Sequence, residues 1–119
     1  MPTLDLPLPP FTDNHTYGRT PAGKQFLKRE ARDWYDDVRW QAKAQGFTPQ
    51  TGEYYTVRVV IRLTPTDNRE IQNLTKLLFD AIFTPQLDRQ IVEFSVKRET
   101  AEKHQEGMMI QWEIEKALL

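Results

Sequence analysis

Alternation between apolar and polar side chains marks four segments of the chain as strands. The clearest alternation runs from Glu53 to Thr64, where the odd-numbered residues Tyr55 to Leu63 are apolar and share one face. The first segment ends at Pro9-Pro10, which suits an edge strand because proline cannot donate to a ladder. We expect strands over residues 3–8, 53–64, 90–98 and 108–115.

Two further segments carry apolar residues at the three- and four-residue spacing of an amphipathic helix. The first is expected to begin at Thr20-Pro21 and to stop at Gly46. The second is expected to be capped by Asp67 or Asn68 and to end near Phe83. Their apolar stripes consist of Leu27, Ala31, Trp34, Val38 and Ala42 in the first, and Ile71, Leu74, Leu78 and Ala81 in the second.

The order of elements is strand, helix, strand, helix, strand, strand, which predicts an α+β fold. We expect a mixed four-stranded sheet with the two helices packed on one of its faces. The chain has 119 residues and a mass of 14.0 kDa, so a single domain over residues 1–119 is expected.

Composition excludes several classes of chemistry. There are no cysteines and only two histidines, which excludes disulfides, thiolate zinc sites and clusters of imidazole ligands. A metal ion would therefore need oxygen ligands. The net charge of −1 gives no general indication of nucleic-acid binding. No apolar run is long enough for a bilayer and the first residues do not resemble a signal peptide, so we expect a cytoplasmic protein without a membrane partner.

Polar residues that could carry chemistry gather between Asp67 and Asp88. On the second helix Gln72, Lys76 and Asp80 are spaced by four and share a face, and Glu70 is expected in the first turn. Spacing alone favours an ordinary solvated helix face with no catalytic role.

Several basic and aromatic residues are candidates for contacts with phosphate or bases. Arg58 and Arg62 share one strand face, and Arg69 opens the second helix, so three guanidinium groups near carboxylates would suit a phosphodiester. A sheet edge protected by charge explains the strand arginines equally well. Tyr17 and Arg19 in the first loop could stack on a base or bind phosphate.

The segment Arg69-Glu70-Ile71-Gln72-Asn73-Leu74-Thr75-Lys76, followed by Phe79-Asp80-Ala81-Ile82, resembles a motif of the RusA family of Holliday junction resolvases. The family pattern is Arg-Asp-x-Asp-Asn-x-x-Lys, then Asp-Ala or Asp-Gly and an aliphatic residue. Downstream, Leu87-Asp88-Arg89-Gln90-Ile91-Val92 is similar to the family's acidic pair followed by Gln-Val-Val. The opening LPLPP and Asp13-Asn14 also resemble the family's first strand and asparagine loop.

The resemblance implies an endodeoxyribonuclease of DNA recombination and repair that nicks four-way junctions symmetrically. It implies Mg²⁺ as the cofactor, held by Glu70 and Asp88, with Lys76 required for cleavage. Gln72 stands where the family has a second aspartate, so it is a candidate metal and catalytic residue. If Gln72 has disabled the metal site, the alternative is a dimer that binds branched DNA without cutting it. The expected DNA contacts are Arg69, Asn73, Arg58, Arg62, Arg19 and Tyr17.

A homodimer is also expected. The resemblance implies one, since twofold symmetry would present two equal sites to a symmetric junction. The residues give a second reason, because a small, polar chain would have difficulty burying Trp34, Trp40 and Trp112.

Overall fold

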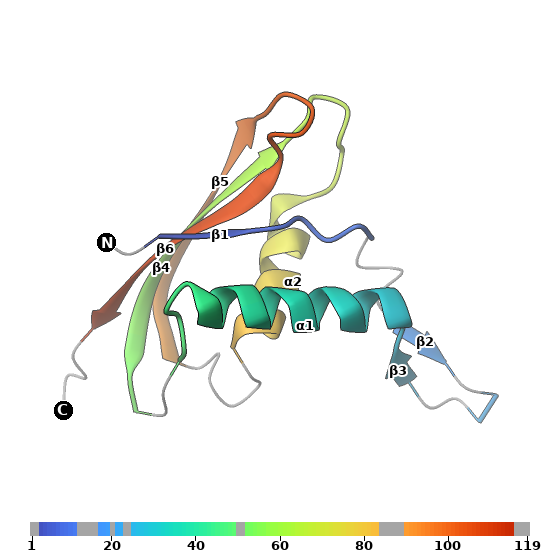
Figure 1. Cartoon of the computed structure of the whole chain (residues 1–119), viewed down its shortest axis with the longest axis horizontal. Helices are drawn as coiled ribbons and strands as arrows, with labels where there is room; N and C mark the ends of the chain where they lie inside the picture. The colour runs from blue at the N-terminus through green and yellow to red at the C-terminus, as the bar shows by residue number, and fades with distance from the viewer. Residues whose placement is uncertain are drawn as a thin grey trace.

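The computed structural model describes residues 3–11, 17–19, 21–22, 25–49, 52–83 and 90–115. Its elements are β1 (Thr3–Leu6), β2 (Tyr17–Arg19), β3 (Gln25–Leu27), α1 (Arg29–Ala44), β4 (Tyr54–Leu63), α2 (Ile71–Ile82), β5 (Ile91–Thr100) and β6 (Gly107–Glu115). Figure 1 shows both helices on the same side of the main sheet. The predicted α+β fold with two helices on one face is therefore confirmed.

The main sheet is mixed and has the strand order β1-β6-β4-β5. Strand β6 pairs antiparallel with both β1 and β4, whereas β4 pairs in parallel with β5. Helix α2 forms the crossover between β4 and β5, as a parallel connection requires. β1 is an edge strand, as its prolines predicted, and β5 forms the opposite edge.

The core lies between the sheet and the helices, and the alternation of β4 decides which residues enter it. All odd-numbered positions from Tyr55 to Leu63 are buried. They join Val38 of α1 and Leu78 of α2, both fully inaccessible to solvent. The even-numbered residues of β4 point to the other face, which no described helix covers (Figure 1).

The prediction that the first helix begins at Thr20-Pro21 is wrong. Pro21 and Ala22 lie in a turn, and Leu27 belongs to β3, which pairs antiparallel with β2 in a small hairpin. Helix α1 starts only at Arg29. The physical reason is that proline suits a turn as well as a first helical position, so Pro21 does not discriminate between them. Thr20 itself lies outside the described residues.

The predicted stop at Gly46 is confirmed, and it has a defined geometry. Gly46 has a φ of +94° and its N–H donates to the carbonyl of Lys43 at 3.0 Å. The N–H of Phe47 donates to the carbonyl of Ala42 at 2.9 Å. These two bonds form a Schellman motif, which satisfies carbonyls that the last helical turn leaves open.

We therefore expect Gly46→Ala to destabilise the protein by about 1–2 kcal/mol, because a side chain is strained in the left-handed region. No atom lies within 4 Å of the position of the new Cβ, so the cost arises from the backbone alone. Urea unfolding followed by circular dichroism measures it. Gly107→Ala is the matched control, since Gly107 is not among the positive-φ glycines. Equal stability of the two variants would contradict the expectation.

Helix α2 ends at Ile82, close to the predicted Phe83, but its expected caps are wrong. Glu70 occupies the N-cap position in an extended conformation, so it precedes the helix instead of lying in its first turn. Asp67 does not cap the helix, because its carboxylate accepts a hydrogen bond from the backbone N–H of Arg69.

The burial of the tryptophans does not follow the expectation that a single chain would have difficulty burying all three. Trp34 is buried and its indole N–H donates to the carbonyl of Pro7 at 3.2 Å. Trp112 is half-buried and packs edge-on against Phe47. Trp40 alone of the three is well exposed, at 70%. The tryptophans therefore give little support for a dimer.

Among the described helices, none combines the length and apolar character needed to span a bilayer.

Candidate functional site

The residues of the REIQNLTK motif lie at the start of α2, in the β4-α2-β5 unit. This is the place where the parallel strands β4 and β5 end, and ligands often bind at the carboxyl ends of parallel strands. Two hollows flank α2. One lies at the beginning of the helix and the other runs between the helix and β5.

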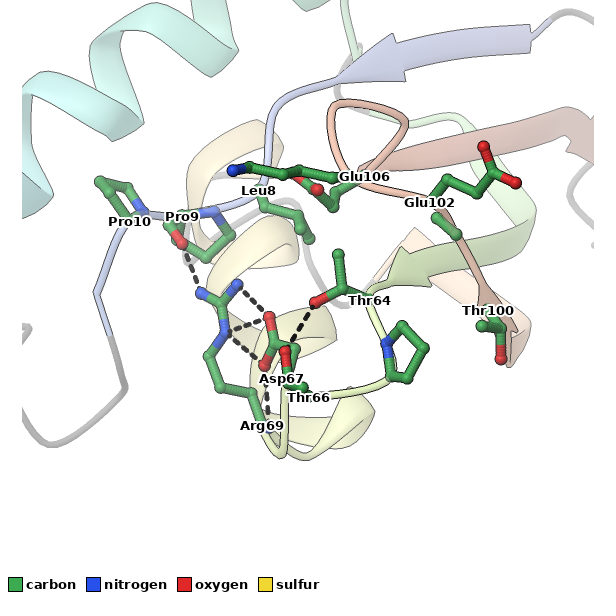
Figure 2. Close-up of a pocket in the computed structure, with 13 residues that line it drawn as sticks. Leu8, Pro9, Pro10, Thr64, Thr66, Asp67, Arg69, Thr100, Glu102 and Glu106 are labelled. Atoms are coloured by element: carbon green, nitrogen blue, oxygen red, sulfur yellow. Dashed lines mark hydrogen bonds and ion pairs between the residues drawn. The ribbon is translucent and has the colours of Figure 1, made fainter.

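The first hollow has a volume of about 740 Å³ and is shown in Figure 2. Its wall is built from the segment that follows β1, the turn after β4 and the turn after β5. Glu102, Lys103 and Glu106 contribute charged, exposed side chains to its lining. With both charge signs present, this hollow shows no clear preference for an anion or a cation.

Arg69 and Asp67 both line this hollow and are bonded to each other (Figure 2). Its Nη2 lies 2.7 Å from Asp67 Oδ2, and its Nε lies 3.1 Å from Oδ1. Its Nη1 donates to the carbonyl of Pro9, sixty residues earlier in the chain. The guanidinium therefore ties the segment that follows β1 to the loop before α2. The expected DNA contact of Arg69 stays a prediction, and these internal bonds already engage three of its nitrogens.

The same contacts hold the pKa of Asp67 below its ordinary value of 3.8. The hydrogen bond from the Arg69 side chain is the largest cause, and partial burial opposes it. The backbone N–H and the charge of Arg69 act in the same direction, as does the charge of Arg98. Arg98 also donates to the carbonyl of Asp67 at 2.8 Å, so two arginines stabilise this turn.

A lowered pKa means that ionised Asp67 stabilises the fold above pH 3.8 and that this contribution is lost as the pH falls through the folded-state pKa. We expect Asp67→Asn to cost about 1.5–3 kcal/mol at neutral pH, the usual range for hydrogen bonds to charged groups. The difference from wild type should shrink below pH 3.8. Urea unfolding at pH 7 and pH 3 measures both, and a difference that grew on acidification would contradict this assignment.

The second hollow, which we call the α2–β5 groove, has a volume of about 590 Å³. Gln72, Lys76 and Asp80 line it from the polar face of α2, so the predicted shared face is confirmed. Gln72 and Lys76 are exposed to solvent. The apolar part of the lining includes Phe79 and Phe94, whose rings meet edge to face at 5.5 Å. The groove thus combines a cation, an amide and a carboxylate with an aromatic floor.

Glu70 and Asn73 lie near the groove in sequence but do not line either hollow. Both side chains are exposed. Glu70 precedes the first turn of α2, and Asn73 lies one residue beyond Gln72 around the helix. The structure thus brings Gln72 and Lys76 together in one groove and leaves Glu70 outside its lining.

The expectation that Arg58 and Arg62 flank the acidic residues is wrong. Both occupy even-numbered positions of β4, which face away from the helices and therefore away from α2. On this face, which no described helix covers, Arg62 Nε lies 3.8 Å from Oε2 of Glu99. The alternative of a charged sheet edge is wrong too, because β4 lies between β6 and β5. Any DNA contact of these arginines would belong to a surface separate from the groove.

For three of the predicted site residues, the side chain lies outside the described part of the structure. Asp88 lies in residues 84–89, outside the described part of the chain. The backbone of Tyr17 and Arg19 forms β2, but their side chains are outside the description. Within the described ranges, no three histidine, cysteine, aspartate or glutamate residues come close enough to hold a metal ion. Glu70 and Gln72 offer oxygen donors of the class that Mg²⁺ accepts, and Asp88 would have to complete the set.

Sequence reasoning missed two features of this region. The Asp67–Arg69 pair was not foreseen. In turns, however, an aspartate side chain commonly accepts a hydrogen bond from the backbone N–H two residues later, as Asp67 does from Arg69. The contribution of Phe94 to the groove was also missed. Its place in the alternation of residues 90–98 could have indicated that it faces the helices.

No family model matches the chain, and no curated protein matches it.

Proposed function

We propose that the protein is a magnesium-dependent endodeoxyribonuclease of the RusA type that acts as a homodimer on four-way DNA junctions. The observation that carries the proposal is the position of Gln72 and Lys76. They are two positions of the RusA-like motif, and they share the exposed wall of one groove. A solvent-accessible cation beside a row of oxygen-bearing side chains is suited to a phosphodiester backbone.

Each residue has a proposed role in the reaction. Glu70, Asp88 and Gln72 would hold the magnesium ion, whose chemistry is to activate water and to neutralise charge at the phosphate. Lys76 would donate to a non-bridging phosphate oxygen and stabilise the charge that develops there. Asn73, Arg69, Tyr17 and Arg19 are proposed to position the DNA strand. Arg58 and Arg62 would contact a junction arm only if it reaches the uncovered sheet face.

A second function is supported by a specific observation. Gln72 supplies a neutral amide where the RusA-like motif has a carboxylate, so the proposed metal site carries one negative charge fewer than the motif would give it. Ligand charge is a main determinant of affinity for divalent cations. The alternative is therefore a dimer that binds branched DNA without cutting it.

The deciding experiment compares cleavage and binding on the same substrate. A labelled four-way junction is incubated with the protein in Mg²⁺ or Mn²⁺, and binding is measured in parallel by gel shift in EDTA. Paired symmetrical nicks support the nuclease, whereas binding without nicks supports the alternative. A linear duplex of the same sequence is the control, and equal affinity for duplex and junction would overturn both.

We expect Lys76→Ala to reduce junction cleavage by about 10²- to 10³-fold, the usual cost of removing one donor to a developing negative charge. Binding should weaken only modestly, with a salt slope reduced by about one unit. Lys43→Ala is the matched control, because Lys43 is an exposed lysine of α1. A loss of binding as large as the loss of cleavage would assign Lys76 to general DNA affinity instead.

A further inference from the structure

Strand β5 is an edge strand with features of an interface. Within the described chain it pairs with β4 on one side and with no strand on the other. It is ten residues long and contains no proline, whereas the other edge, β1, has only four residues. Val92 and Phe94 on β5 are 56% and 55% exposed. A long edge with exposed apolar side chains is a template for pairing with another strand.

The charges of β5 are complementary to those of a second copy of the same strand. In an antiparallel pair related by a twofold axis normal to the sheet, each face is preserved and one residue lies opposite its own copy. If that residue is Ser95, Glu93 lies opposite Lys97 of the second copy, and this ion pair occurs twice. Phe94 then lies opposite Val96 of the second copy.

The two faces of β5 agree with this register. Glu93, Ser95 and Lys97 are exposed and pair with even-numbered residues of β4, so they lie on the uncovered face. Phe94 and Val96 pair with Val57 and Val59 on the helix face, where they line the α2–β5 groove. The dimer would therefore form ion pairs on one face and an apolar cluster on the other.

Neighbouring registers are less favourable. Centring on Val96 brings Glu93 opposite Glu99, and centring on Lys97 brings the two lysines together, so both place like charges in contact. Centring on Phe94 brings Glu93 opposite Ser95 and forms no ion pair from Glu93. In the single chain, Lys97 Nζ lies 3.5 Å from Oε1 of Glu99 on the same strand. This ion pair is exposed, so it contributes little to stability and its loss would cost little.

We propose that two copies of the chain associate through antiparallel pairing of their β5 edges, centred on Ser95. The sheet would continue across the dimer with all four helices on one side and the two α2–β5 grooves beside the axis. This inference rests on the homodimer of the proposed function but not on its cleavage activity. Two equal grooves about an axis would suit a twofold-symmetric junction.

Charge reversal at the paired positions tests the proposal. Glu93→Lys places two lysines opposite each other, and Lys97→Glu places two glutamates opposite each other, in each case twice. We expect either variant to weaken the dimer by about tenfold or more, measured by light scattering across a dilution series. The double variant Glu93→Lys with Lys97→Glu should dimerise again, and an equimolar mixture of the two single variants should form a heterodimer.

Glu113→Lys is the control, because Glu113 is an exposed residue of the internal strand β6 and receives the same change of charge. Circular dichroism checks that every variant is folded. A wild-type species of 14.0 kDa at all concentrations would overturn the proposal. A dimer that neither reversal weakens, or that the double variant does not restore, would overturn it as well.

Cross-linking tests the register itself, since the chain contains no cysteine. Ser95→Cys should form an intermolecular disulfide on mild oxidation. Glu99→Cys should not, because it would lie eight strand positions, roughly 26 Å, from its own copy. Cross-linking of the second variant but not the first would refute this register. A β5-paired dimer that fails to cut junctions would leave this inference standing and remove the nuclease proposal.

Discussion

Glu70→Gln is expected to reduce magnesium-dependent junction cleavage by about a hundredfold or more. Removing a residue that only hydrogen-bonds to a metal ligand typically lowers metal affinity or activity by about 10–100-fold, and Glu70 is proposed to be a ligand itself. The substitution preserves shape and removes the charge proposed to hold the metal. Junction binding should be retained or strengthened, because a negative charge near the phosphates is lost. Cleavage assays and gel shifts on one junction separate the two effects.

Glu102→Gln is the matched control, because it removes an exposed carboxylate that lines the hollow beside Arg69. It should cleave like wild type. If Glu70→Gln abolished binding while circular dichroism showed an intact fold, the assignment of Glu70 to the metal would be wrong. If it cut as fast as wild type, Glu70 would have no part in the reaction.

Gln72→Asp is expected to raise magnesium-dependent cleavage about tenfold or more, because ligand charge strongly controls affinity for divalent cations. The position lies in the first turn of α2, where a negative charge also interacts favourably with the helix dipole, so the fold should tolerate it. Rates across a magnesium titration should show saturation at lower metal concentration. Gln105→Asp, in the exposed turn before β6, controls for net charge.

The opposite result would also be informative. Gln72 and Glu70 are each one methylene longer than the aspartates they resemble, so the pair could work as an adapted unit. In that case Gln72 would orient a metal-bound water, and shortening it would lower activity. A wild type that cuts well and a slower Gln72→Asp variant would refute the idea that Gln72 weakens the site.

The main elements could be predicted because their signals are long. Every odd-numbered residue of β4 from Tyr55 to Leu63 is apolar, and α2 repeats its apolar residues over three turns. The β2–β3 hairpin was missed because strands of three residues are too short to show a period, and Leu27 happens to continue the stripe of α1. The register shift between Tyr55 and Thr56, which displaces Val92 from the ladder, left no clear signal in the alternation.

The candidate site was predictable along a single element but not between elements. Helical spacing correctly placed Gln72 and Lys76 on one face. The two-residue period of a strand placed Arg58 and Arg62 on one face, but it did not relate them to the helix. Their alternation with buried valines puts them on the face that the helices leave open. Long-range placement depends on packing, which no local pattern specifies.

The pairing of β1 with β6 has a consequence for synthesis on the ribosome. Thr3 lies opposite Gln111, and β6 also occupies the place between β1 and β4. The first strand therefore has no partner in the sheet until β6, the last strand of the sheet in chain order, has been translated. Pairings this distant in sequence slow folding and leave apolar strands exposed during elongation. We expect the nascent chain to acquire protease resistance only after residue 115 has left the exit tunnel, in one late step.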